Sequence, residues 1–232
     1  MSLVILCASH LKHEQNVEQM IEMLDSQMSQ TQVCHVYVSY TGLSLHYDNP
    51  MVHLIKQPED QLTQFQHYKK LVRQLLESGV IHSENYAIFT DDDDIMAPER
   101  NAEYLLLICP GLEVALIDKS VVRFSVDCDI QEHAATMQEI GLKDDVFIFN
   151  YMNPREYVDL CIRGDLLMNF IDMVDGAKYC CDCEFNVVVY NYLTRHRDTC
   201  IEISAKKPLY YYRYSMFRGI RHKYLEELNN MA

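Results

Sequence analysis

Residues 85–100, NYAIFTDDDDIMAPER, place four consecutive aspartates directly after a short apolar run. The run at 86–90 has the length and the aromatic content of a buried strand, and the apolar pair Ile95 and Met96 follows the acidic residues. Like charges are therefore concentrated where the chain leaves the core. Their repulsion is weakly screened beside apolar residues, so this arrangement needs a partner of opposite charge.

Working outward, short apolar runs alternate with amphipathic stretches. The periodicity predicts strands at 2–8, 33–40, 51–55 and 86–90, and helices at about 17–28, 61–78 and 98–108. This order predicts an α/β fold with a mainly parallel central sheet and helices on both faces. Ligands of such sheets bind beyond the carboxyl ends of the strands, and the four aspartates follow one of those ends.

The second half of the chain is less regular. Strands are predicted at 114–118, 121–126, 146–151 and 208–214, one or two helices at 156–174, another at 184–196, and a final basic helix at 216–228. No internal repeat or long linker interrupts the chain. The 232 residues therefore predict a single domain.

Composition excludes several classes of function. The net charge of -14, from 34 acidic and 20 basic residues, opposes binding to nucleic acid or anionic membranes. No apolar run approaches a membrane span, and the first ten residues lack the basic region of a signal peptide, so we expect a soluble cytoplasmic protein. Nine cysteines, an odd number, indicate reduced thiols. A zinc site at Cys180, Cys181 and Cys183 would lack a fourth ligand at recognisable spacing.

Two interpretations of the aspartates compete. One aspartate could cap the helix that begins at Pro98, but four are more than a cap needs. A divalent cation would remove the repulsion, and carboxylate oxygens suit Mg²⁺ or Mn²⁺ together with substrate phosphates. An EF-hand loop would require glycine near Met96 and glutamate at Ala102, and a zinc site would require histidine or cysteine. The pattern favours a phosphate-bound metal.

The segment 91–99, DDDDIMAPE, resembles the D-x-D segment of GT-A fold glycosyltransferases, especially the family 2 type. The strand at 2–8 with the following loop, the strand at 33–40 and the helix at 64–74 occur in the order found in that family. The chain is also similar in size to the small soluble transferases of large algal viruses, which would place it in the host cytoplasm. The resemblance implies a Rossmann-like GT-A domain, with a nucleotide-sugar-binding half at 1–110 and an acceptor-binding, catalytic-base half at 111–232.

The resemblance assigns roles to the acidic residues. It implies that Asp93 and Asp91 hold Mn²⁺ or Mg²⁺ against the donor diphosphate, and that Asp92 and Asp94 make further donor or metal contacts. Ser9 falls in the nucleotide-binding loop. Where family members have an aspartate for the base, this chain has Ser39 and Tyr40, so the base is not defined; Tyr40 either stacks on it or packs in the core.

Further residues complete the implied site. The general base of the family lies at the start of a helix after the D-x-D segment, where Asp182 and the reserve candidate Glu184 stand. Asp182 could also serve as the N-cap of that helix. Near the C-terminus, Arg213 and Arg218 are candidates for the diphosphate, whereas Lys223 is better explained by pairing with the acidic surface. His67 is a weaker phosphate candidate.

The function implied is transfer of a sugar from a nucleotide-diphosphate donor, expected to be a UDP-sugar, to a glycan or other hydroxyl acceptor, with inversion. A metal-dependent phosphatase or nucleotidyl enzyme could use the same aspartates. A non-catalytic, metal-stabilised binding module is a third alternative. Sugar and acceptor depend on pocket shape, which this resemblance does not resolve.

Overall fold

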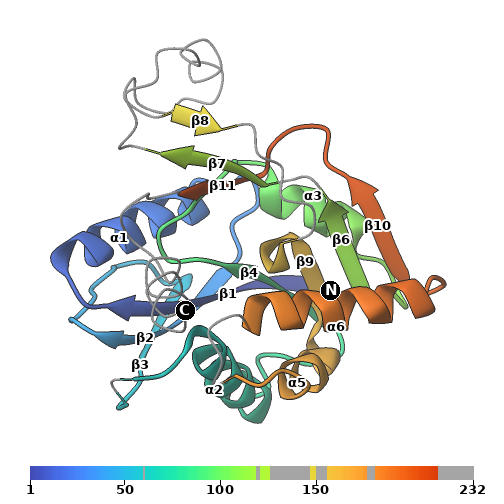
Figure 1. The fold of residues 1–232 in the computed structure, drawn as a ribbon, viewed down its shortest axis with the longest axis horizontal. Helices are drawn as coiled ribbons and strands as arrows, with labels where there is room; N and C mark the ends of the chain where they lie inside the picture. Colours follow the sequence, from blue (N-terminus) through green and yellow to red (C-terminus); the bar gives the residue numbers. More distant parts are fainter. Residues whose placement is uncertain (60, 119–120, 126–146, 150–155, 177–180, 214–232) are drawn as a thin grey trace, which may run out of the picture.

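The computed structural model describes residues 1–59, 61–118, 121–125, 147–149, 156–176 and 181–213. Its central sheet has seven strands in the order β10-β6-β9-β4-β1-β2-β3 (Figure 1). Their bounds are β1 Ser2–Leu11, β2 His35–Gly42, β3 Val52–Lys56, β4 Asn85–Thr90, β6 Val114–Asp118, β9 Leu160–Arg163 and β10 Cys200–Ser204. Only β9 runs antiparallel to its neighbours, β4 and β6. The predicted α/β fold with a mainly parallel sheet is confirmed.

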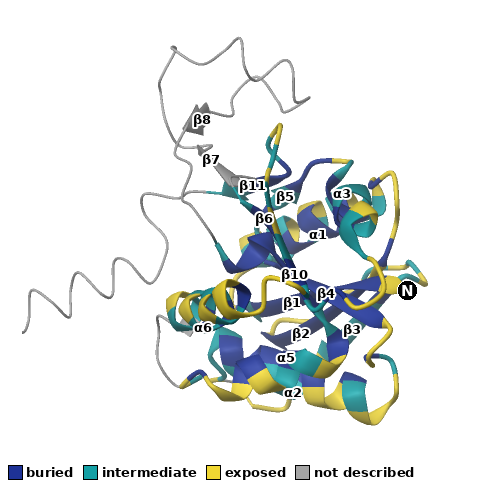
Figure 2. Ribbon diagram, turned by 90° about the vertical axis from the view of Figure 1, so that its right-hand side faces the viewer, coloured by how far each residue is buried: buried dark blue, intermediate teal, exposed yellow. Residues whose placement is uncertain are grey.

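Helices cover both faces of this sheet (Figure 2). On one side lie α1 (Glu14–Met28) and α3 (Arg100–Leu107), and on the other lie α2 (Gln64–Glu77), α5 (Gly164–Asp172) and α6 (Cys181–Arg195). The inner strands of this sheet are mostly buried, with all six residues of β4 inaccessible to solvent or nearly so, whereas the edge strands β3 and β10 are largely accessible. Apolar runs on such strands are explained by this double cover.

Local sequence signals fix the beginning of α2. The Thr63 hydroxyl accepts the Gln66 N–H at 3.2 Å, and the Gln66 side chain accepts the Thr63 N–H at 2.8 Å. This reciprocal pair is a capping box, which satisfies two N–H groups that the first helical turn leaves unpaired. The helix then buries Phe65, Tyr68 and Leu71 against the sheet. Its first turn consequently lies at a defined place beside the sheet.

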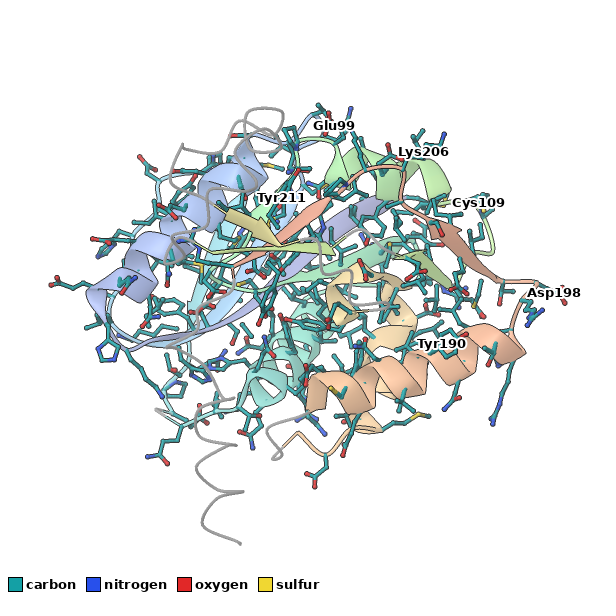
Figure 3. The ribbon with its side chains drawn as sticks, turned by 45° about the horizontal axis from the view of Figure 1, so that its top comes forward. Glu99, Cys109, Tyr190, Asp198, Lys206 and Tyr211 are labelled. Carbon is teal, nitrogen blue, oxygen red and sulfur yellow. The ribbon has the colours of Figure 1, made fainter. Side chains whose placement is uncertain are left out.

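A second, four-stranded sheet has the order β5-β11-β7-β8. It contains β5 (Ile95–Met96), β7 (Val121–Ser125), β8 (Phe147–Phe149) and β11 (Tyr210–Arg213). The chain entering β11 passes the beginning of α3, where Lys207 and Glu99 form an ion pair of 3.0 Å; Figure 3 shows Glu99 near this crossing and Tyr211 on β11. Because β5 pairs with β11, this small sheet ties the chain that follows the aspartates to a segment far along the sequence.

Three sequence predictions in the second half need correction. Residues 156–174 are not purely helical, because a 3-10 turn (Tyr157–Asp159) and β9 precede α5. The strand β10 was not predicted. The helix that carries Asp182 begins at Cys181, so Asp182 lies in its first turn and does not precede it. The helix predicted at 184–196 and the strand predicted at 208–214 are present as α6 and β11, while the helix predicted at 216–228 lies outside the described residues.

Candidate functional site

The four aspartates lie at the carboxyl edge of the central sheet. They follow β4 at Thr90 and precede β5, and β4 is the neighbour of β1. The side chains of Asp91, Asp92 and Asp93 are partly accessible, whereas Asp94 is fully buried. We call residues 91–94 the aspartate cluster. Its position is the one where ligands of open parallel sheets bind.

Asp91 is held by side chains from three distant segments. Its carboxylate accepts a hydrogen bond from the Gln64 side chain at 2.5 Å and another from the Tyr157 hydroxyl. Its backbone N–H donates to the Tyr210 hydroxyl at 2.8 Å. Gln64 opens α2, Tyr157 precedes β9 and Tyr210 opens β11. This carboxylate therefore has a fixed orientation, as a metal or substrate ligand requires.

Ser9, predicted to lie in a loop, belongs to the last part of β1 and contributes directly to the cluster. The Ser9 hydroxyl donates a hydrogen bond to Asp92, and Ser9 is itself buried. The structure thus brings together two residues that the sequence assigned to donor binding. Tyr40 is 6% exposed and belongs to the hydrophobic core, which agrees with the packing alternative for its ring in this structure. Its predicted contact with a nucleotide base stays a prediction.

Asp94 and Arg213 contact each other through the backbone. The Arg213 N–H donates to the Asp94 carboxylate at 2.6 Å, while the Arg213 guanidinium pairs with Glu22 at 2.6 Å. The positive charge of Arg213 also lowers the pKa of Asp93, opposing the dominant effect of burial. Arg213 is thus the cation that reaches the cluster from β11. Arg218, the second arginine predicted to bind the diphosphate, lies outside the described residues.

The aspartate cluster carries strongly raised pKa values. Burial raises the pKa of Asp91 to about 7, that of Asp92 to about 6 and that of Asp93 to about 7, with repulsion between neighbouring carboxylates as a further cause. Burial and repulsion also raise the pKa of Asp94 well above its usual range, despite hydrogen bonds from Tyr210 and from the Arg213 backbone. Each carboxylate is therefore costly to ionise without a compensating cation.

The predicted base lies within electrostatic reach of the cluster. Asp182, in the first turn of α6, is one of the charges that raise the pKa of Asp91. Both Asp182 and Glu184 are partly accessible. A carboxylate from a distant segment therefore lies near enough to the cluster to influence Asp91 by its charge.

The carboxylates of the aspartate cluster are possible ligands of a divalent metal ion. Among the described residues, no three histidine, cysteine, aspartate or glutamate side chains converge as a metal site. Mg²⁺ and Mn²⁺ commonly use one or two carboxylates and complete their shell with water and substrate phosphates, so fewer protein ligands suffice. The partly accessible, mutually repelling carboxylates of Asp91 and Asp93 fit such an ion chemically. Asp94 is a weaker fit because it is fully buried.

A cluster of polar side chains, not predicted from the sequence, lies near the carboxyl ends of β1 and β2. The Gln57 amide donates to the Ser39 hydroxyl at 3.0 Å, and Ser39 lies 2.9 Å from Nδ1 of His67. The rings of His67 and His10 meet edge to face at 4.9 Å. Which of Ser39 and His67 donates in this contact depends on the tautomer of the His67 ring. Nε2 is buried with no hydrogen-bond partner among the described atoms.

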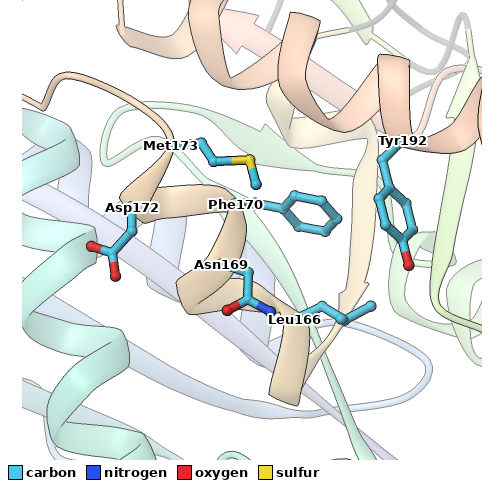
Figure 4. Close-up of a pocket in the computed structure, with 6 residues that line it drawn as sticks. All are labelled: Leu166, Asn169, Phe170, Asp172, Met173 and Tyr192. Atoms are coloured by element: carbon cyan, nitrogen blue, oxygen red, sulfur yellow. The ribbon is translucent and has the colours of Figure 1, made fainter.

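A cavity of about 420 Å³ lies apart from these residues, between α5 and α6 (Figure 4). Its lining is mostly apolar and consists of Leu166, Asn169, Phe170, Asp172, Met173 and Tyr192. None of the predicted site residues contributes to it. Catalytic chemistry is therefore better placed at the aspartate cluster, where ionisable groups gather.

Comparison with known proteins shows the fold. No protein-family model and no curated protein matches the chain. Among solved structures, Staphylococcus aureus TarS 1-349 matches with a TM-score of 0.56 at 14% identity, over 92% of this chain and 60% of that one. A 4-diphosphocytidyl-2C-methyl-D-erythritol synthase matches with a TM-score of 0.53 at 12% identity, over 98% of both chains. The 2-C-methyl-D-erythritol 4-phosphate cytidylyltransferase of Francisella tularensis has a TM-score of 0.50 at 10% identity, over the full length of both.

These similarities establish a GT-A-like, Rossmann-like α/β fold. The chain spans 60% of the TarS segment. In the part of the chain that the structure describes, no helix is long and apolar enough to cross a membrane.

Proposed function

We propose that this chain is a metal-dependent glycosyltransferase that transfers a sugar from a nucleotide-diphosphate donor, expected to be a UDP-sugar, to the hydroxyl of a glycan or similar acceptor. The observation that supports the proposal is that the aspartate cluster lies at the carboxyl edge of the sheet, with Asp182 of α6 near enough to raise the pKa of Asp91 by its charge. In the proposed reaction the aspartate cluster binds a metal and phosphate, and Asp182 takes a proton. A family 2-like enzyme would need both.

In this proposal Asp91 and Asp93 hold Mn²⁺ or Mg²⁺, and Ser9, Asp92 and Arg213 border the donor. A bound divalent ion would supply positive charge between the carboxylates and the donor diphosphate. Gln64, Tyr157 and Tyr210 orient Asp91 through the hydrogen bonds described above. The Arg213 guanidinium would turn from Glu22 toward the departing phosphates, where opposite charge stabilises the transition state.

Asp182 would act as the general base. It would accept the proton of the acceptor hydroxyl as that oxygen forms its bond to the sugar carbon, while the bond from the same carbon to the nucleotide diphosphate breaks. Attack from the face opposite the leaving group inverts the configuration at that carbon. Glu184, one helical half-turn further along α6, is the alternative base.

Product analysis tests this proposal. The chain would be incubated with a panel of UDP-sugars and hydroxyl acceptors, with Mn²⁺, with Mg²⁺ and with excess chelator. We expect release of UDP together with a glycosylated acceptor only when a metal is present. UDP release without any glycosylated product would indicate hydrolysis, and no turnover of any donor would favour a non-catalytic binding module.

Nucleotidyl transfer is the second candidate. It is favoured by the cytidylyltransferase match, which covers both chains in full, whereas the TarS match covers 60% of its partner. A nucleotidyl enzyme would combine a nucleoside triphosphate with a phosphorylated substrate and release pyrophosphate. Pyrophosphate release from CTP or UTP with a sugar phosphate, in the absence of UDP-sugar turnover, would replace the first proposal by this one.

A further inference from the structure

Two histidines face each other at the amino edge of the same sheet, where the strands begin, opposite the aspartate cluster. His35 is the first residue of β2 and His53 is the second residue of β3, the edge strand beside it (Figure 1). Nδ1 of His35 lies 2.9 Å from Nε2 of His53, and the ring centroids are 5.1 Å apart. His35 is exposed and His53 is partly accessible. The pair is therefore open to solvent and to small ions.

The two rings are held differently. In the register of the parallel pair, His53 lies opposite Tyr37, and its ring stacks on the Tyr37 ring at 4.4 Å with an interplanar angle of 12°. Tyr37 is itself 9% exposed, so it provides a fixed platform. His35 has more freedom because it is exposed at the start of its strand. One ring is thus preorganised and the other can adjust.

We propose that His35 and His53 form a binding site for a divalent transition-metal ion of the Zn²⁺ class. Imidazole nitrogen is a preferred ligand of Zn²⁺, Cu²⁺ and Ni²⁺, whereas Mg²⁺ and Mn²⁺ prefer oxygen. Two nitrogens bound to one tetrahedral zinc at 2.0–2.1 Å lie roughly 3.3 Å apart. The observed separation needs to open by only a few tenths of an ångström, which a small rotation of the His35 side chain supplies.

The site would be an exchangeable one. Within the described ranges no third histidine, cysteine, aspartate or glutamate joins the pair, so water completes the coordination shell. Binding would be weaker than at structural zinc sites with four protein ligands. Since the two ligands come from adjacent strands, the ion would clip the edge strand β3 to β2. Residues 52–56 would then open less often, with slower exchange of their amide hydrogens.

Zinc titration of the untagged chain tests this site. Binding would be measured by calorimetry in excess Mg²⁺, for the parent and for His35→Gln, His53→Gln and the control His46→Gln, which alters another exposed histidine. We expect one zinc equivalent for the parent and for the control. Either pair variant should lose at least about tenfold in affinity, which is the least that loss of even an outer-shell partner usually costs.

Hydrogen exchange supplies the second readout. Zinc should slow exchange at residues 52–56 in the parent and in His46→Gln, and it should have no effect there in either pair variant. Equal zinc affinity in all four proteins, or zinc protection that does not involve β3, would overturn the proposal and leave the pair as a simple hydrogen bond. The outcome does not depend on the proposed transferase activity, because UDP binding is not measured.

Discussion

The carboxyl and amino edges of the central sheet, where its strands end and begin, carry different chemical groups. At the carboxyl edge, the partly accessible carboxylates of Asp91, Asp92 and Asp93 crowd together after β4, and partial burial and mutual repulsion raise their pKa values. At the amino edge, His35 and His53 form a solvent-accessible pair of nitrogen donors between β2 and β3. The first set suits hard oxygen-binding cations with phosphates, and the second suits transition metals.

The two edges also differ in how they are assembled. The histidine pair arises from the register of adjacent strands and two side chains alone. The aspartate cluster depends on Gln64, Tyr157, Tyr210 and Arg213, which come from three separate segments. Substitutions at the carboxyl edge should therefore alter donor binding and catalysis, whereas those at the amino edge should leave both intact. Substitutions at each edge test whether the two sites are independent.

The largest expected effect is on the rate of transfer. Asp182→Asn keeps the shape of the side chain but cannot accept a proton, so sugar transfer should slow by at least about a hundredfold. Loss of the charge in the first turn of α6 should cost only about 1 kcal/mol or less of stability. Rates would be measured with saturating donor, together with Mn²⁺ and UDP binding, which should stay close to those of the parent.

The matched controls are Glu184→Gln and His35→Gln. Both should transfer sugar at nearly the parental rate. If Asp182→Asn is unimpaired and Glu184→Gln is slow, the base is Glu184. If neither is impaired, the inverting mechanism is wrong.

A second effect separates the members of the aspartate cluster. Asp93→Ala should lose metal-dependent donor binding, because it removes a partly accessible carboxylate beside the position proposed for the metal. Asp94→Ala should do less harm to binding. It leaves the partly buried N–H of Arg213 without its acceptor, so it should instead cost about 1 kcal/mol of stability, less whatever is recovered from reduced repulsion. Calorimetry with UDP and Mn²⁺, and denaturant unfolding, would measure the two effects. Parental binding by Asp93→Ala would remove Asp93 from the metal site.

The carboxyl edge shows how far sequence reasoning reaches. Four aspartates after an apolar run indicate a strand end with a charged ligand, and strand order places it at the correct edge of the sheet. Tyr210 and Tyr157 could not be assigned, because their contacts with the cluster exist only after distant segments pack together. Tyr210 was predicted to lie in a strand, but nothing in a run of tyrosines shows which hydroxyl points to Asp91.

The second half of the chain shows a different limit of prediction from sequence. β9 has only four residues, and its apolar sequence continues directly into α5, so periodicity cannot separate strand from helix. Gly164 marks the boundary, since a Cβ there would lie 2.5 Å from the backbone oxygen of His82. That close approach is invisible in the sequence. β10 lies at the edge of the sheet with only Cys200 buried, and its five residues were not predicted as a strand between α6 and β11.

The third effect concerns the metal itself. UDP should stabilise the protein only when Mn²⁺ or Mg²⁺ is present, because the aspartate cluster otherwise repels the diphosphate. At a UDP concentration of 100 times its dissociation constant, the stabilisation should be about 2.7 kcal/mol. A thermal-shift series with each metal, and with excess chelator, measures this. Equal stabilisation in chelator would exclude a metal-bridged site, and His35→Gln should behave as the parent does.

The smallest effect comes from His67, which lies near the carboxyl edge but outside the aspartate cluster. Burial, with the positive charges of His10 and Lys70, lowers the pKa of His67 to about 3. The unfolded chain therefore binds the proton more readily than the folded one below pH 6.5. Its contribution to stability is fully present above pH 6.5 and is lost as pH falls toward 3, by about 2 kcal/mol at pH 5 if its unfolded pKa is 6.5.

The aspartate cluster has the opposite sign, because raised carboxylate pKa values make the folded state less stable as pH rises from 4 to 7. Comparing the parent with His67→Gln, which keeps a polar group beside Ser39, isolates the histidine. The carboxylates affect both proteins alike, so the free energy of unfolding of the parent minus that of His67→Gln should decrease as pH falls from 7 to 5 and should be constant above pH 7. Parallel curves would mean that His67 binds its proton as readily in the folded state as in the unfolded state. That result would contradict the burial of the polar side chains around Ser39.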